Sequence, residues 1–235
     1  MAAEATQKSQ LKSGLKPADN ERVHSRMVDS MKEPLQKQRS LNPALPLLWL
    51  GLAVWGVLAM MSYSNQPGPA DAAPGKWPAE SKLPRPSKTP ALILFVHPRC
   101  AWSKASIGEL SSLMTHCQGR VHAYVLFFRP SRQPTNWVPS DFWRQAAAIP
   151  GVRVVLDEDG CEARLFRAET SGEVVLYGAP GRLRFQGGIT LSRGRLGENP
   201  GRMALQALIY QQPSQVTQTP VFGCPLFGDN LTARR

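Results

Sequence analysis

One stretch of the chain stands apart in its hydrophobic pattern because it carries no charged residue. Residues 43–63, PALPLLWLGLAVWGVLAMMSY, are apolar on every side of a helix. A helix of about 20 apolar residues spans the hydrocarbon layer of a membrane. Trp49, Trp55 and Tyr63 are residue types that favour the membrane–water interface. The pattern therefore predicts a single transmembrane helix over residues 43–63.

Basic residues lie on one side of this apolar run. Lys32, Lys37 and Arg39 come shortly before it, whereas the next basic residue after it is Lys76. Cytoplasmic flanks of membrane helices carry the excess of Lys and Arg. We therefore expect residues 1–42 to be a polar cytoplasmic tail and the larger C-terminal part to be extracytoplasmic (periplasmic), with the protein a single-pass protein of the cell membrane.

A cleaved signal peptide is the competing interpretation of the same run. Small residues suited to cleavage occur at 70–73, ADAA. The polar leader before the apolar run is much longer than that of a signal peptide, which favours an uncleaved anchor. Residues 64–90 contain repeated prolines and predict a semi-rigid, extended spacer that holds the next domain away from the membrane.

Beyond residue 90, continuous apolar runs alternate with runs of helical spacing. Apolar runs of this length are typical of strands buried on both faces of a sheet, and alternation with helices requires parallel crossovers. The turn APGR separates two further strands and indicates a hairpin. The sequence therefore predicts an α/β domain over residues 91–212 with a mixed sheet flanked by helices, followed by a tail over 213–235. Strands are expected at 91–97, 120–128, 152–157, 173–178 and 182–188, and helices at 101–117, 140–148, 161–169 and 199–211.

Composition narrows the classes of partner. The 235 residues are 42% hydrophobic, enough for a core, and carry a net charge of +11. This excess is spread along the chain without a dense basic helix, so we expect no nucleic-acid partner. Cysteine and histidine do not occur at zinc spacing, and the acidic turn LDEDGCEA lacks the spaced ligands of a calcium loop. The sequence predicts neither a metal nor a cofactor.

Candidate chemistry centres on FVHPRCAWSKASIGEL, in which Cys100 lies between a strand and a helix. Unpaired N–H groups and the helix dipole stabilise a thiolate at that place. Arg99 and Lys104 add positive charge, and His97 adds it when protonated, while Ser103 can donate a hydrogen bond to the sulfur. Cys100 is therefore the candidate nucleophile, with a lowered pKa; the alternative is a buried cysteine that only packs.

A nucleophilic Cys100 needs a second thiol to complete a redox cycle. An external thiol could release it, or Cys117, Cys161 or Cys224 could act as the resolving cysteine. Four cysteines allow three complete pairings, and the sequence does not choose between them. Cys224 is favoured because its tail, QTPVFGCPLF, carries apolar residues that could dock onto the domain. Disulfide formation is feasible in an oxidising extracytoplasmic compartment.

Four strings carry a resemblance to a known family: HPRCAWSKAS, TSGEVVLYGAPGRLRFQGGIT, SRGRLGENPGR and TPVFGCPLF. Over about residues 91–211 the chain resembles the thioredoxin-like superfamily, and within it the membrane-tethered RedB-like subgroup. Ser103 stands where a thioredoxin motif has its second cysteine, and Trp102 where RedB-like sequences often have one. Ser171 and Gly172 stand in the stretch that usually carries a cis-proline.

The resemblance implies a thiol–disulfide oxidoreductase-like protein that acts on thiol- or disulfide-bearing proteins. Its site would be a single-cysteine CxxS motif formed by Cys100 and Ser103, with His97 and Arg99 in supporting positions. The departures from the family pattern motivate an alternative, a non-catalytic binding or assembly module with the same fold.

Overall fold

The computed structural model describes residues 44–138 and 140–227. The predicted polar tail over residues 1–42 lies outside the described residues, as does the end of the C-terminal tail. Within the described part, the chain divides between Trp55 and Gly56 into two units.

Helix α2, Ala44–Asn65, corresponds to the charge-free run. Its mean hydropathy is 2.0 and none of its residues is buried, which makes it a candidate membrane span by length and composition. It ends two residues later than predicted, and in its last turn the side chains of Ser64 and Asn65 donate hydrogen bonds to the carbonyl oxygens of Met60 and Met61, four residues earlier.

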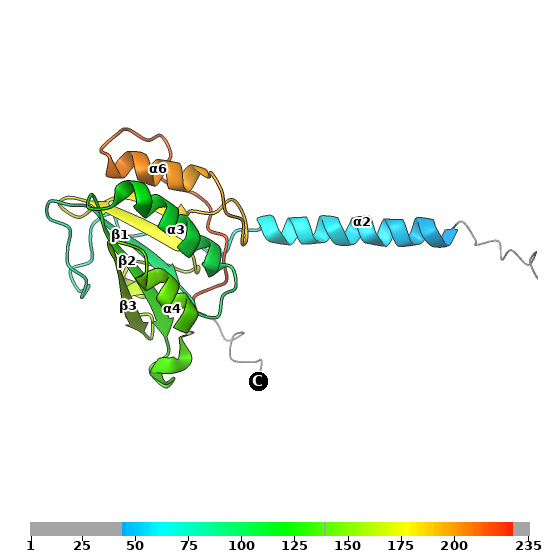
Figure 1. The fold of residues 1–235 in the computed structure, drawn as a ribbon, viewed down its shortest axis with the longest axis horizontal. Coiled ribbons are helices and arrows are strands. Elements are labelled where there is room, and N and C mark those ends of the chain that lie inside the picture. The colour runs from blue at the N-terminus through cyan, green and yellow to red at the C-terminus, as the bar shows by residue number, and fades with distance from the viewer. Residues whose placement is uncertain (1–43, 139, 228–235) are drawn as a thin grey trace, which may run out of the picture. The chain divides into compact units, whose positions relative to one another are not determined.

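The second unit is built on a five-stranded mixed sheet in the order β3-β2-β1-β4-β5 (Figure 1). Strands β1, β2 and β3 are parallel, and the β4–β5 hairpin pairs antiparallel to β1. Every residue of the central strand β1 is buried, as its continuous apolar run predicts. The expected mixed sheet is thus confirmed, with strands β1 Ala91–Val96, β2 His122–Arg129, β3 Val152–Glu158, β4 Glu173–Gly178 and β5 Arg182–Gly188.

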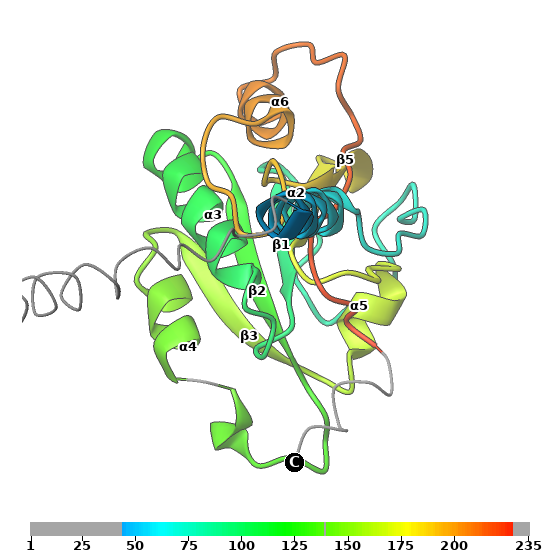
Figure 2. The ribbon, with the colours of Figure 1, turned by 90° about the vertical axis from the view of Figure 1, so that its right-hand side faces the viewer.

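Three helices cover one face of the sheet (Figure 2): α3 Ser103–Cys117, α4 Ser140–Ala147 and α6 Pro200–Ile209. Helix α3 buries Ile107, Leu110, Leu113 and Met114, whose spacing places them on one face of the helix. Helix α6 begins as expected, because the side chain of Asn199 accepts the backbone N–H of Arg202 and a proline occupies the first turn.

The opposite face is covered by the short helix α5, Cys161–Leu165, and by the Pro-rich segment. Trp77 is buried and meets the rings of Phe166 and Tyr177 edge-on, with centroids 5.0 and 5.3 Å apart. Leu83 is buried in the same cluster. The prediction of an extended spacer over residues 64–90 is therefore wrong for residues 73–83, which pack on the domain and add apolar surface to the face that the five residues of α5 cover.

Candidate functional site

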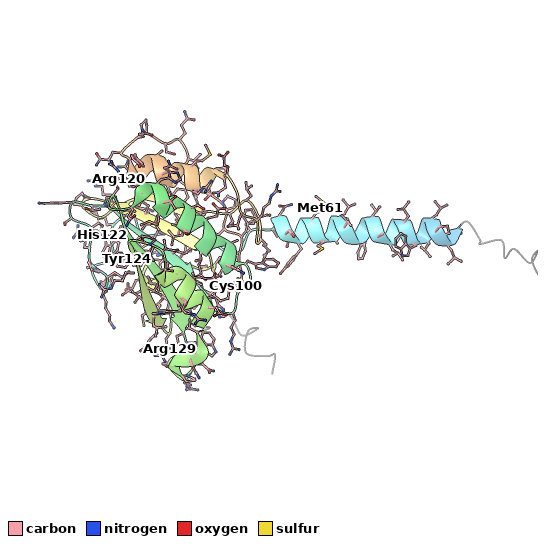
Figure 3. The ribbon with its side chains drawn as sticks, viewed as in Figure 1. Met61, Cys100, Arg120, His122, Tyr124 and Arg129 are labelled. Atoms are coloured by element: carbon pink, nitrogen blue, oxygen red, sulfur yellow. The ribbon has the colours of Figure 1, made fainter. Side chains whose placement is uncertain are left out.

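Cys100 lies in the turn between β1 and α3, three residues before the helix begins. Its N–H donates to the carbonyl oxygen of His97 at 3.0 Å, and its own carbonyl oxygen accepts the N–H of Ser103 at 3.1 Å. Figure 3 shows Cys100 at the opposite end of α3 from Arg120. Only 1% of the Cys100 surface is exposed, so the covering groups decide what the thiol can do.

One of these covering groups is the C-terminal tail. The carbonyl oxygen of Cys224 accepts the N–H of Ser171 at 2.8 Å, and the N–H of Leu226 donates to the carbonyl oxygen of Glu169 at 2.8 Å. With the Thr170–Pro225 bridge between them, these bonds pair the tail antiparallel to the loop that precedes β4. Leu226 is buried against the sheet, so the tail docks on the domain.

Tail docking brings Cys224 into hydrogen-bonding contact with Cys100. The other two cysteines are placed elsewhere. Cys117 is buried at the far end of α3, about 20 Å along the helix at 1.5 Å per residue. Cys161 is exposed at the start of α5, on the other face of the sheet. Of the three partners that the sequence leaves open, the fold brings Cys224 alone beside Cys100.

The two thiols are electrostatically unequal. A hydrogen bond from the Cys224 thiol lowers the pKa of Cys100 to about 5 against the opposing effect of burial, with further donation from Ser103 and from the backbone N–H groups of Cys224 and Trp102. The pKa of Cys224 is raised far above its ordinary value by its bond to Cys100, by burial and by the negative charge of Cys100. Both shifts favour the negative charge on Cys100 and the proton on Cys224.

Two serines extend this set of hydrogen bonds away from the sulfur. The hydroxyl oxygens of Ser103 and Ser171 lie 2.7 Å apart, and the N–H of His97 donates to Ser171 Oγ at 2.7 Å. Both serine side chains are buried. Ser171 stands in the stretch where the resembled family carries a cis-proline, and neither its spacing nor its neighbours in the sequence predict this role.

The side chain of His97 does not supply the positive charge that the sequence suggested. The imidazole is 2% exposed and lies 5.6 Å from the ring centroids of both Phe128 and Trp137. Burial and then the charge of Arg99 lower the pKa of His97 to about 4, so the ring is neutral at pH 7. The prediction that His97 adds positive charge beside Cys100 is therefore wrong at neutral pH. The guanidinium of Arg99 lies over the ring of Trp137, 5.0 Å from its centre.

Arg193 is a site residue whose place was not predicted. Its loop, SRGRLGENPGR, is one of the strings that carry the family resemblance. Arg193 Nη1 donates to the carbonyl oxygen of Gly223 at 3.0 Å, and its Nη2 donates to that of Gln66 at 3.3 Å. The guanidinium also lies 4.6 Å from the ring centre of Tyr63. Arg193 therefore ties the residue before Cys224 to the segment that follows the apolar run.

Over residues 44–138 and 140–227, no group of three or more His, Cys, Asp or Glu side chains is placed to hold a metal ion.

Two solved structures are similar to this chain in fold. A hypothetical protein of Sinorhizobium meliloti matches with a TM-score of 0.52 and 15% identity, over 69% of this chain and 97% of that one. An uncharacterized conserved protein of Geobacillus kaustophilus matches with a TM-score of 0.51 and 18% identity, over 70% and 92%. The fold is thioredoxin-like. At these identities the likeness concerns the fold alone.

A more distant match is titled a secreted Mycobacterium tuberculosis disulfide oxidoreductase homologous to E. coli DsbE. It has a TM-score of 0.40 and 15% identity, over 53% of this chain and 83% of that one. No protein-family model matches the chain. No curated protein matches it either.

Proposed function

We propose that this protein is a membrane-anchored, extracytoplasmic thiol–disulfide oxidoreductase-like protein in which Cys100 is the nucleophile and Cys224 the resolving cysteine. The observation that carries the proposal is the docking of the tail on the loop before β4, which places Cys224 beside Cys100 in the turn before α3. Anchoring rests on α2, and the orientation rests on the basic residues before it. The finer assignment to the RedB-like subgroup rests on the four sequence strings.

The first step follows from the charge of the pair. The Cys100 thiolate attacks one sulfur of a client disulfide, an S–S bond forms between Cys100 and the client, and the client's own S–S bond breaks. The released client thiolate takes a proton from the medium. Since the thiolate, not the thiol, is the nucleophile, a pKa of about 5 keeps Cys100 reactive at neutral pH.

The second step follows because the first step removes the negative charge of Cys100. Once Cys100 is in the mixed disulfide, it no longer carries the negative charge or accepts the bond that raise the pKa of Cys224. Arg193, which lowers that pKa, remains in place. Cys224 then loses its proton and attacks the Cys100 sulfur. The second client thiol leaves, and a Cys100–Cys224 disulfide remains, so two electrons have passed to the client. An external dithiol restores the pair by the same exchange.

Burial of Cys100 favours one alternative function. A thiol that is 1% exposed under a docked tail also suits a binding or assembly module in which no exchange occurs. Such a module would hold its partner without a covalent bond. Its complexes would survive Cys100→Ala and a reducing agent, whereas a mixed disulfide would not.

The test uses the full chain in detergent with a disulfide-bonded peptide as client. Cys224→Ser should accumulate a stoichiometric mixed disulfide on Cys100, because the resolving thiol is absent. Cys100→Ser should form none, and Cys161→Ser, which removes an exposed thiol, should behave as wild type. Capture of the client by Cys100→Ser to the extent seen in Cys224→Ser would refute the assignment.

A further inference from the structure

The hydroxyl of Ser171 is fixed by two contacts whose direction can be deduced. Ser171 is 1% exposed, and its Oγ lies 2.7 Å from the backbone nitrogen of His97 and 2.7 Å from Ser103 Oγ. A backbone N–H can only donate, so Ser171 Oγ accepts from His97. The proton of the Ser171 hydroxyl is left for another acceptor, and Ser103 Oγ is at hydrogen-bonding distance.

The direction of the Ser103–Ser171 bond follows from the state of the sulfur. A hydroxyl has one proton to donate. When Cys100 is a thiolate, Ser103 uses its proton for the sulfur, as the hydrogen bond between them requires. Ser103 then has only acceptor capacity toward Ser171, so Ser171 donates to Ser103. The donors run in one direction: His97 N–H to Ser171, Ser171 to Ser103, and Ser103 to Cys100.

We propose that Ser171 is a positioning residue that turns the hydroxyl of Ser103 toward the Cys100 sulfur. This inference rests on the proposed function and assigns a role to a residue that does not touch the reacting atom. Hydrogen bonds in such a chain polarise one another in a buried site, so the bonds upstream strengthen the final bond, from Ser103 to the sulfur. The backbone N–H of Ser171 also holds the carbonyl oxygen of Cys224. One residue therefore orders both the nucleophile and the tail that bears its partner.

The groups around Cys100 do not account for all of the stabilisation of its thiolate, and the hydrogen bonds of the two serines supply a measurable part. Cys224 faces it from the tail as a protonated thiol, and His97 precedes it as a neutral ring. Arg193 reaches the tail at Gly223, and Arg99 lies over Trp137. Removing the Ser171 hydroxyl takes a hydrogen-bond acceptor from the backbone N–H of His97 but removes none of these side chains. A hydrogen bond to a charged group is worth enough that its loss should raise the pKa of Cys100 by about one unit.

The experiment is a thiolate absorbance titration of the full chain, with the Cys100→Ser variant subtracted. Ser171→Ala and Ser103→Ala should each raise the pKa of Cys100 by about one unit. Ser171→Thr, which keeps a hydroxyl, should restore the wild-type value. Ser106→Ala removes a buried hydroxyl from the next turn of α3 and serves as the matched control.

A double-mutant cycle isolates the chain of bonds. Because Ser171 acts through Ser103, the Ser103→Ala, Ser171→Ala double variant should shift the pKa no further than Ser103→Ala alone. Additive shifts, or a wild-type pKa in Ser171→Ala, would overturn the inference. Should Ser171→Ala not fold, a wild-type pKa in Ser103→Ala overturns it as well. Failure of the proposed function looks different: Cys100→Ser would still capture the client, whatever the serines do.

Discussion

Gly223 lies where the C-terminal tail packs against the loop before β4. A Cβ atom at this position would lie 1.8 Å from the carbonyl oxygen of Ser171, whereas Cβ atoms essentially never come within 3.0 Å of another group. The obstacle is backbone, which cannot rotate away as a side chain would. Gly223→Ala should therefore lift the tail from the loop.

The energy at stake can be estimated from the contacts of the tail. Lifting it breaks the backbone bonds at Cys224 and Leu226, worth about 1 kcal/mol each. It also exposes the buried side chain of Leu226, worth about 2 kcal/mol. The freed residues regain conformational entropy, which offsets part of this loss. If the regained entropy offsets about half of this loss, Gly223→Ala destabilises the docked tail by about 2 kcal/mol. That change shifts the equilibrium from docked to open tail by more than tenfold.

The assay is the rate at which iodoacetamide alkylates Cys100, followed by peptide mass spectrometry. Cys100 is covered by the docked tail, so Gly223→Ala should raise this rate at least tenfold at constant pH. Gly75→Ala is the matched control, because a Cβ there meets no atom within 4 Å. Equal rates in wild type and Gly223→Ala would refute the argument that the tail shields the thiol.

Three further predictions concern other parts of the structure. Cys224→Ala should raise the pKa of Cys100 by about one unit, because it removes the leading donor to the thiolate, and Cys224→Ser should raise it less; a thiolate titration measures both. Burial raises the pKa of Glu173 from 4.5 to about 7, so the folded state binds this proton more tightly than the unfolded chain does. The stability that this proton provides is complete below pH 4.5 and is lost as the pH rises through about 7, so thermal melts of wild type should fall over this window more than those of Glu173→Gln; parallel curves would contradict the assignment. Val54→Arg places a charge within α2 at a cost of about 3 kcal/mol and should reduce the membrane-bound fraction in sedimentation assays, whereas Lys88→Ala in the second unit should not.

Local pattern was sufficient for much of the fold. The strand at Ala91–Val96 is apolar at each position because both faces of the sheet are covered, and the Asn199 cap is a contact within a few residues. The Pro-rich segment was misjudged for a related reason. Proline reports the conformation of the chain, not the surface against which Trp77 packs, and that surface is made by residues about 90 and 100 positions later.

The features of the site also fall into those that local sequence predicts and those that depend on contacts distant in the sequence. Cys100 could be located because a strand-to-helix junction is a local feature of the sequence. Its pairing with Cys224 depends on a tail that crosses back over the sheet, so three partners remained open until the fold was known. The neutral state of His97 depends on Phe128 and Trp137, which come from other elements. No spacing rule could anticipate these contacts.

The most direct test of the central claim is a disulfide map of the full chain after mild oxidation, read by mass spectrometry without reduction. The thiol pair beside α3 predicts a Cys100–Cys224 linkage as the main product, with Cys117 and Cys161 left unlinked. A map in which Cys100 is joined to Cys117 or Cys161, or stays a free thiol while Cys224 is oxidised, would contradict the account.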